Sequence, residues 1–287
     1  TDVSCCPCKP PDPQTQKARA GITMPTSWCR TSLELLRQSS APVDQDGRRP
    51  GEERRPRTAS SACYGPFSHD LPRLRGAMSP NAFRDEDLRV FGMEWKANVI
   101  RWQMTRNWGA TGTERDFAEY ERWLDAELED LDKVLEACAR YGIKVVVDMH
   151  SPVGGRYQNR DLAIFHEMPY QDRWVAHWEK MARRYKGSKG VWGYDLVNEP
   201  VQNKPSPEGV PDYLGAQARA ATAIRAIDPD VPIFIEAAEW DSAKGFQDLD
   251  PVDVPKVIYQ VHMYDPGQFT HQGVHGSPTG VVYPGKI

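Results

Sequence analysis

A ten-residue stretch, Val-Trp-Gly-Tyr-Asp-Leu-Val-Asn-Glu-Pro at 191–200, most narrows what this chain can fold into. The apolar and aromatic residues up to Val197 are typical of a strand covered on both faces, as in parallel sheets. Pro200 has no N–H to donate, so strand pairing is expected to end there. Asn198 and Glu199 are therefore predicted to stand at the carboxyl-terminal tip of a strand. In parallel α/β barrels, side chains at these tips face the active site.

Strands and helices alternate along the chain from Leu71 onward. Six strands are predicted, at residues 73–78, 99–104, 143–149, 191–197, 231–236 and 257–262. Helices are predicted near 85–96 and at 117–138, 174–185 and 212–227. The helix at 117–138 has the clearest pattern, because its apolar residues recur at steps of three and four and Gly142 ends it.

Repeated strand and helix units imply right-handed crossovers, in either an open doubly wound sheet or a closed barrel. A nucleotide-binding doubly wound sheet usually has a glycine-rich turn after its first strand, and residues 76–80 do not form one. The predicted fold is therefore α/β, a (β/α)8 TIM barrel. Such barrels have eight strands in about 250 residues. With about six strands in the sequence, the chain is expected to end two strands short.

The chain divides near His69 into two predicted parts. Residues 1–68 are rich in Pro, Arg, Ser and Cys and show no sustained periodicity, so disorder is expected, as in a linker or an out-of-frame coding sequence. Residues 69–287 are predicted to form a partial catalytic domain. Cys5 and Cys8 form a Cys-x-x-Cys pair, but no second pair follows, and so a metal site is not expected there.

Composition argues against two classes of partner. The 287 residues are 39% hydrophobic and 26% charged, with no apolar run near the roughly 20 residues that a membrane-spanning helix needs. A net charge of −4 and a pI near 6.0 argue against nucleic acid as a partner. No secretory signal is visible at the first residues.

The stretch at 191–200 resembles the fourth-strand signature of glycoside hydrolase family 5, the cellulase family of clan A. Three further stretches resemble that family's strands in the right order: 98–102 the second strand, 145–150 the third, and 259–264 the sixth. The resemblance covers Leu71 to the end of the chain. It implies a retaining hydrolase of β-linked polysaccharide, similar to a cellulase or endo-β-1,4-glucanase, that needs no cofactor.

The same resemblance implies roles for six residues. Glu199 would be the acid/base, and Asn198 would bind the sugar 2-hydroxyl. The remaining catalytic positions would be Arg101, which pairs with the nucleophile, His150, His262 and Tyr264. From the residues alone, the alternative to pairing with the nucleophile is a structural ion pair with Asp148 or Asp195, because a charge inside an apolar strand needs a partner. A nearby negative nucleophile would raise the pKa of Glu199.

Pyranose rings stack on aromatic side chains, so aromatics at or beyond strand ends are candidate sugar platforms. The candidates are Trp102, Trp108, Trp240, Tyr157 and Phe269, with His271 as a further cleft residue. Packing of loops is the alternative role for these aromatics.

In the family, the nucleophile is a Glu at the end of the seventh strand, and the sequence contains no candidate for that strand. Glu236 and Glu239 follow the fifth strand and are interpreted as cleft or structural residues. The chain by itself is therefore expected to have negligible activity.

Two other classes of function stay open. A metal-dependent barrel hydrolase could use Asp148, His150, His166 and His262, although residues 73–78 lack the His-x-His pair common in such enzymes. A fragment that only binds glycan is the other alternative. The expected partner is a polysaccharide or oligosaccharide, bound by a monomer; whether glucan, mannan or xyloglucan stays open. By resemblance, the location would be extracellular or periplasmic.

Overall fold

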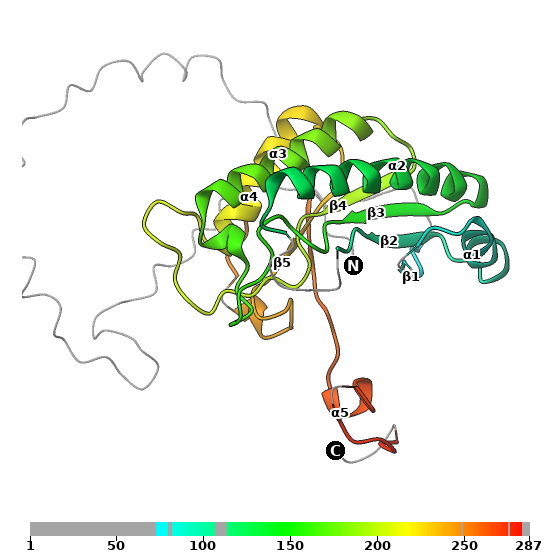
Figure 1. The fold of residues 1–287 in the computed structure, drawn as a ribbon. Helices are drawn as coiled ribbons and strands as arrows, with labels where there is room; N and C mark the ends of the chain where they lie inside the picture. The colour runs from blue at the N-terminus through cyan, green and yellow to red at the C-terminus, as the bar shows by residue number, and fades with distance from the viewer. Residues whose placement is uncertain (1–72, 80–81, 107–113, 248, 275, 283–287) are drawn as a thin grey trace, which may run out of the picture. The chain divides into compact units, whose positions relative to one another are not determined.

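The computed structural model describes residues 73–79, 82–106, 114–247, 249–274 and 276–282 (Figure 1). All of them belong to a compact unit that begins at Tyr64. The disorder predicted for residues 1–68 and the sugar platform predicted at Trp108 lie outside the described residues.

Six parallel strands form one sheet whose spatial order follows the chain, from β1 to β6. The strands are β1 (Gly76–Met78), β2 (Val99–Gln103), β3 (Lys144–Asp148), β4 (Val191–Asp195), β5 (Ile233–Glu236) and β6 (Val257–Gln260). A doubly wound sheet reverses its strand order, whereas a barrel does not. The observed order therefore agrees with the predicted barrel, and all six predicted strands are present.

The four predicted helices are present among the described residues, whereas one further short helix and two 3-10 turns were not predicted. The helices are α1 (Asp85–Arg89), which continues as the π-helix η3 (Val90–Glu94), α2 (Phe117–Tyr141), α3 (Met168–Tyr185), α4 (Tyr213–Ile227) and α5 (Gly267–Thr270), with short 3-10 turns η5 (Ala163–Phe165) and η6 (Gly245–Gln247). The Asp116 side chain caps the start of α2 by accepting the Glu119 N–H, and Gly142 ends this helix with φ 71°. Helices α2, α3 and α4 cover one face of the sheet (Figure 1). None of the described helices has an apolar stretch long enough to cross a bilayer.

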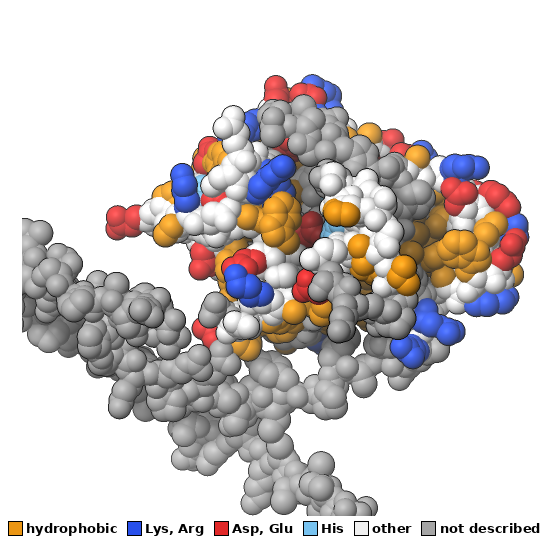
Figure 2. Space-filling model, turned by 90° about the horizontal axis from the view of Figure 1, so that it is seen from below, with side chains coloured by type: hydrophobic (Ala, Val, Ile, Leu, Met, Phe, Trp, Pro, Cys, Tyr) orange, Lys and Arg blue, Asp and Glu red, His pale blue; other side chains and the backbone are white. Residues whose placement is uncertain are grey.

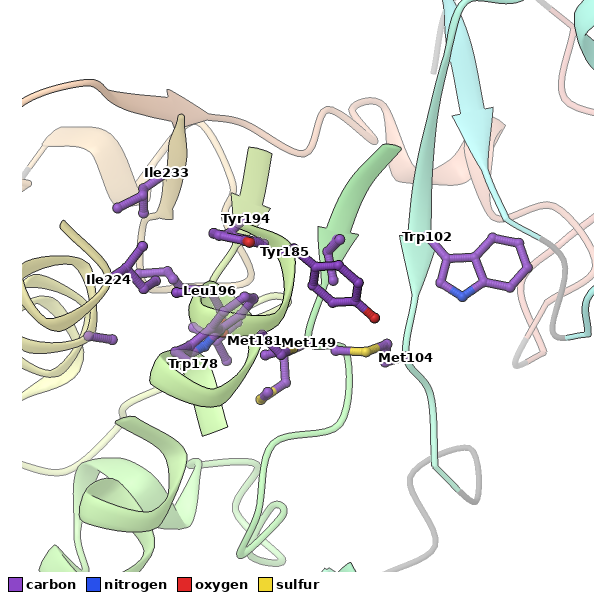
Figure 3. Packing of buried hydrophobic residues seen from close by; sticks show 14 of the residues in the cluster. Trp102, Met104, Met149, Trp178, Met181, Tyr185, Tyr194, Leu196, Ile224 and Ile233 are labelled. Atoms are coloured by element: carbon purple, nitrogen blue, oxygen red, sulfur yellow. The ribbon is translucent and has the colours of Figure 1, made fainter. Parts of the chain in front are cut away.

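The main hydrophobic core lies between the sheet and these helices. Strand residues such as Tyr194 and Ile233 pack there beside Trp178 and Met181 of α3 (Figure 3). Trp102 belongs to this core and is only 4% exposed. Its prediction as a sugar platform is wrong, because Trp102 shares a strand face with buried Ile100 and so lies on the side away from Arg101.

The opposite face of the sheet carries polar side chains at the strand ends. Strand register places Gln103 beside Asp148 and Asp148 beside Asp195, while Glu236 pairs with Gln260. Side chains on one face alternate with those on the other, so these residues share the face that the helices do not cover. This polar face is where the candidate site lies.

Exposed apolar side chains gather near β1, an edge strand of the sheet. Met78, Met93 and Trp95 are 51%, 50% and 73% exposed. Figure 2 shows hydrophobic side chains at this end of the molecule, which carries α1.

Candidate active site

Glu199 lies beyond the carboxyl end of β4, as predicted for a strand tip. The strand itself ends at Asp195, two residues earlier than expected, and residues 196–198 lead to Glu199. The carboxylate Oε1 of Glu199 lies 3.0 Å from Nδ1 of His262, which follows β6. The structure thus brings together two residues that are 63 positions apart in the sequence.

Arg101 lies at the centre of a buried cluster of charges. Its guanidinium lies 2.8 Å from Asp148 Oδ2, 2.7 Å from Asp195 Oδ2 and 3.1 Å from Glu236 Oε1, and all three carboxylates are fully buried. Burial lowers the pKa of Arg101, but the three carboxylates outweigh burial and raise the pKa above its usual value. The ion pair with Asp148 or Asp195, one of the two roles considered for Arg101, is therefore present.

This cluster has three carboxylates and one guanidinium, so it favours retention of a proton. Burial, together with repulsion from Asp195, raises the pKa of Glu236 well above 4.5. The pKa of Asp195 is raised mainly by burial, and Arg101 opposes that shift. Gln260 connects the two carboxylates, because its Nε2 donates to Asp195 Oδ2 at 2.7 Å and also to Glu236 Oε1. A neutral amide bridges them without adding charge.

The pKa of Glu199 is lowered from 4.5, contrary to the prediction. Burial raises this pKa. The hydrogen bond from His262 and the electrostatic effects of His262, His150 and Arg156 lower it, and together they outweigh burial. The prediction assumed a negative nucleophile next to Glu199. Within the described part of the chain, cationic groups determine the shift instead.

His150 lies beside Asp148 at the end of β3. Its Nδ1 is 2.8 Å from Asp148 Oδ2 and 3.1 Å from Gln103 Nε2. Because Asp148 also pairs with Arg101, His150 is connected to the buried charge cluster. Its side chain is 21% exposed, which leaves it accessible to a ligand.

Two cavities meet at Glu199 and Trp240. The first, the His150 cavity, has a volume of about 230 Å³ and is also lined by Asn198 and Tyr157. The second, the His262 cavity, has a volume of about 990 Å³ and is also lined by Tyr264 and His271. The residues that line the two cavities include eight of the predicted site residues: Asn198, Glu199, His150, Tyr157, Trp240, His262, Tyr264 and His271.

The other predicted platforms are placed differently. Phe269 lies in α5, is 36% exposed and does not line either cavity. Trp240, in contrast, is 43% exposed and lines both. Of the predicted sugar platforms that the structure describes, Trp240 is therefore the one that lies between the two cavities.

Comparison with known families agrees with this geometry. Residues 67–280 match the family model for Cellulase (glycosyl hydrolase family 5). The chain belongs to glycoside hydrolase family 5. Its six parallel strands and their helices are similar to the TIM barrels of family 5 endoglucanases.

Individual members of the family are distant relatives. Cellodextrinase A of Ruminococcus flavefaciens is 30% identical over 162 residues, which are 54% of this chain and 45% of that protein. Endoglucanase C of Acetivibrio thermocellus is 29% identical over 160 residues, covering 54% of this chain and 44% of the relative. The chain thus matches less than half the length of each. Cel5A of Thermotoga maritima, solved in complex with cellobiose, has a TM-score of 0.55 and 25% identity, covering 70% of this chain and 66% of that one.

Arg156 contacts the Glu199 turn and was not predicted from the sequence. Arg156 lines the His150 cavity, and its Nη2 donates to the carbonyl oxygens of Asn198 and Glu199 at 3.0 and 2.8 Å. A loop arginine that binds backbone carbonyls leaves no periodic signal in the sequence. Gln260 was also missed, although it is a polar residue in an apolar strand, the same signal that drew attention to Arg101.

One group of side chains in this family 5 domain has metal-ligand spacing. Within the described ranges, one group of three potential metal ligands lies close together: Glu236, Asp241 and His262, whose ligand atoms are within 4.8 Å of one another. Two of them already have other partners, because Glu236 binds Arg101 and His262 binds Glu199. We therefore assign no metal to this group.

The geometry does not support the alternative of a metal-dependent hydrolase. Its four proposed ligands, Asp148, His150, His166 and His262, do not form a metal-binding group in the part of the chain that the structure describes. His166 pairs with Asp161 at 3.1 Å instead. The geometry thus favours carboxylate chemistry at Glu199.

Proposed function

We propose that this protein is a retaining glycoside hydrolase of β-1,4-linked glucan, with Glu199 as the general acid/base. The observation that carries the proposal is the position of Glu199, whose partly exposed carboxylate opens onto two cavities beside Asn198 and Trp240. A carboxylic acid at such a position can protonate the oxygen of the leaving sugar.

The other residues fit supporting roles. Arg101 Nη2 donates to Asn198 Oδ1 at 3.0 Å, which orients the Asn198 amide and leaves its NH2 group to donate to a sugar 2-hydroxyl. That contact strengthens in an oxocarbenium-like transition state and so lowers the barrier. His262 holds the Glu199 carboxylate, while His150, Tyr264 and Trp240 line the cavities.

Retention requires a second carboxylate about 5–5.5 Å from the acid/base. Glu236 does not suit this role, because its side chain is fully buried and held by Arg101. We propose that the nucleophile is a further carboxylate that the described residues do not supply. Its negative charge would raise the pKa of Glu199, offsetting the effect of His262.

The substrate class follows from the family and from the cavities. Relatives are named cellodextrinase and endoglucanase, and Thermotoga maritima Cel5A was solved with cellobiose bound. Trp240 and Tyr157 offer aromatic faces on which glucose rings can stack. We propose a β-1,4-glucan or its oligosaccharides as substrate, bound by a monomer.

The test is hydrolysis by the longest native form of the protein, compared with Glu199→Gln. Cellulose derivatives, cello-oligosaccharides, mannan and xyloglucan are the substrates, and proton NMR of the first product gives the anomeric configuration. We expect glucan to be the preferred substrate, retention at the anomeric carbon, and a loss of about 100-fold or more in Glu199→Gln. Glu208→Gln, an exposed carboxylate on a loop, is the control. Full activity in Glu199→Gln would overturn the assignment.

A further inference from the structure

Glu199 has an unusual backbone conformation. Its φ is 49°, in the left-handed region that residues with a Cβ rarely adopt. Such a conformation persists only where the surrounding structure holds it, and functional sites are where it most often occurs. Contacts that fix this backbone therefore also fix the direction of the carboxylate.

Two side chains hold the backbone of Glu199 from either side. On one side, Glu236 Oε2 accepts the Glu199 N–H at 2.5 Å. On the other, Arg156 Nη2 donates to the carbonyl oxygens of Asn198 and Glu199 at 3.0 and 2.8 Å. Both peptide groups that flank the Cα of Glu199 are therefore held by side chains. The bonds from Arg156 are charge-assisted, which makes them stronger than hydrogen bonds between neutral groups.

The Glu236 contact is itself firmly anchored. The backbone N–H of Glu236 donates to Gln217 Oε1 at 3.0 Å, and its carbonyl accepts from Gln217 Nε2 at 2.9 Å. Its other carboxylate oxygen binds Arg101. Glu236 thus links the Glu199 turn to the rigid end of β5.

Arg156 also connects this turn to the aromatic side chain between the two cavities. Its guanidinium carbon lies 5.0 Å from the centre of the Trp240 ring, within cation–π range. The Trp240 backbone N–H in turn donates to the Pro200 carbonyl at 3.2 Å. The ring on which a sugar would stack is therefore in contact with the group that holds Glu199.

Resting on the proposed role of Glu199, we propose that Arg156 is a positioning residue that aligns the acid/base carboxylate and couples it to a sugar bound at Trp240. Arg156 does not touch the reacting atoms. It acts by holding the strained peptide groups of Glu199, whose misplacement by about 1 Å can cost about 100-fold in rate. Its positive charge also stabilises the Glu199 carboxylate.

The experiment compares Arg156→Met, Arg156→Lys and a matched control in the longest native form of the protein. The control is Arg225→Met, because Arg225 likewise donates to backbone carbonyls, those of Asp228 and Val231 at 3.0 and 2.8 Å, near the amino end of β5. Values of kcat and KM are measured on cellotetraose, which needs a proton at its leaving oxygen, and on 2,4-dinitrophenyl cellobioside, which does not.

For Arg156→Met we expect kcat on cellotetraose to fall about 10- to 100-fold, with less than about a threefold loss on the aryl glycoside. The basic limb of the pH profile should move to higher pH, because removal of a positive charge raises the pKa of Glu199. Arg156→Lys should leave that limb in place and still lose kcat on cellotetraose, since one ammonium cannot reproduce the fork of the guanidinium. Arg225→Met should lose both activities equally, or neither.

Equal losses on the two substrates in Arg156→Met, with an unmoved basic limb, would show a merely structural role. If Arg156→Met does not fold, Arg156→Lys decides by its ratio of losses on the two substrates. Failure of the underlying function is a separate result. In that case Glu199→Gln keeps its activity on cellotetraose, whatever the Arg156 variants do.

Discussion

Arg101 and Trp102 are neighbours in β2, yet they occupy opposite environments. Trp102 lies in the apolar core on the helix-covered face, whereas Arg101 lies on the polar face among three buried carboxylates. On the apolar face, the fold is stabilised by many weak contacts of similar kind. Changing one side chain there removes only its own contacts. On the polar face each charge depends on its partners, and loss of one leaves the others uncompensated. The face that carries the candidate catalytic residues is therefore also the face where mutations are expected to destabilise the fold most.

The largest effect on stability is expected for Arg101→Met. It leaves Asp148, Asp195 and Glu236 buried without their cation, and breaking a buried ion pair in this way costs about 3–5 kcal/mol. The free energy of unfolding in urea measures the loss. Arg183→Met, which breaks a solvent-accessible pair with Glu179 within α3, is the control and should cost about 1 kcal/mol or less. Similar losses in the two variants would contradict the contrast between the faces.

An intermediate, pH-dependent effect is expected for Asp241→Asn. Burial, opposed by the Ala237 N–H hydrogen bond, raises the pKa of Asp241 from 3.8 to about 7. Between about pH 4 and pH 7, the folded state therefore keeps a proton on Asp241 that the unfolded state releases. This contribution to stability is complete below about pH 4 and is lost as the pH rises through 7.

The asparagine variant should remove that dependence, because its side-chain oxygen can still accept the Ala237 N–H. We expect Asp241→Asn to gain about 1–3 kcal/mol relative to the parent on going from pH 4 to pH 8. Chemical unfolding across this range measures it. A difference between variant and parent that stays constant with pH would show that Asp241 titrates normally.

The smallest effect is expected on the apolar face, for Tyr194→Phe. The Tyr194 hydroxyl is buried and has no hydrogen-bond partner within the described ranges. Its removal should change the free energy of unfolding by no more than about 0.5 kcal/mol, or stabilise the fold slightly, since no hydrogen bond is lost. A loss above about 1.5 kcal/mol in a thermal or urea unfolding experiment would reveal a partner for this hydroxyl.

The apolar face is also what made the fold predictable from sequence. The helix at 117–141 and the six strands were expected at nearly their observed positions, because periodic apolar residues and β-branched runs report which side chains face a core. The strand-tip positions of Glu199, His150 and His262 followed from the same pattern. The resemblance to the family predicted which strand each of these residues follows.

The polar face was harder to predict, for physical reasons. Burial alternates along β2, with Ile100 and Trp102 on the buried face and Arg101 on the other, so the sequence pattern does separate Trp102 from Arg101; the prediction of Trp102 as a sugar platform used only its place at the end of the strand. Arg156 acts through backbone carbonyls, which any sequence presents. The lowered pKa of Glu199 depends on charges that converge only in three dimensions.

The central claim is that Glu199 donates the proton to the leaving group, and leaving-group dependence tests it most directly. In the longest native form of the protein, single-turnover rates of Glu199→Ala and parent are compared on cellotetraose and on 2,4-dinitrophenyl cellobioside. We predict that the glycosylation rate of Glu199→Ala falls about 100- to 10,000-fold on cellotetraose and far less on the aryl glycoside, whose leaving group departs without a proton. Equal losses on both substrates, or no loss on cellotetraose, would contradict the account.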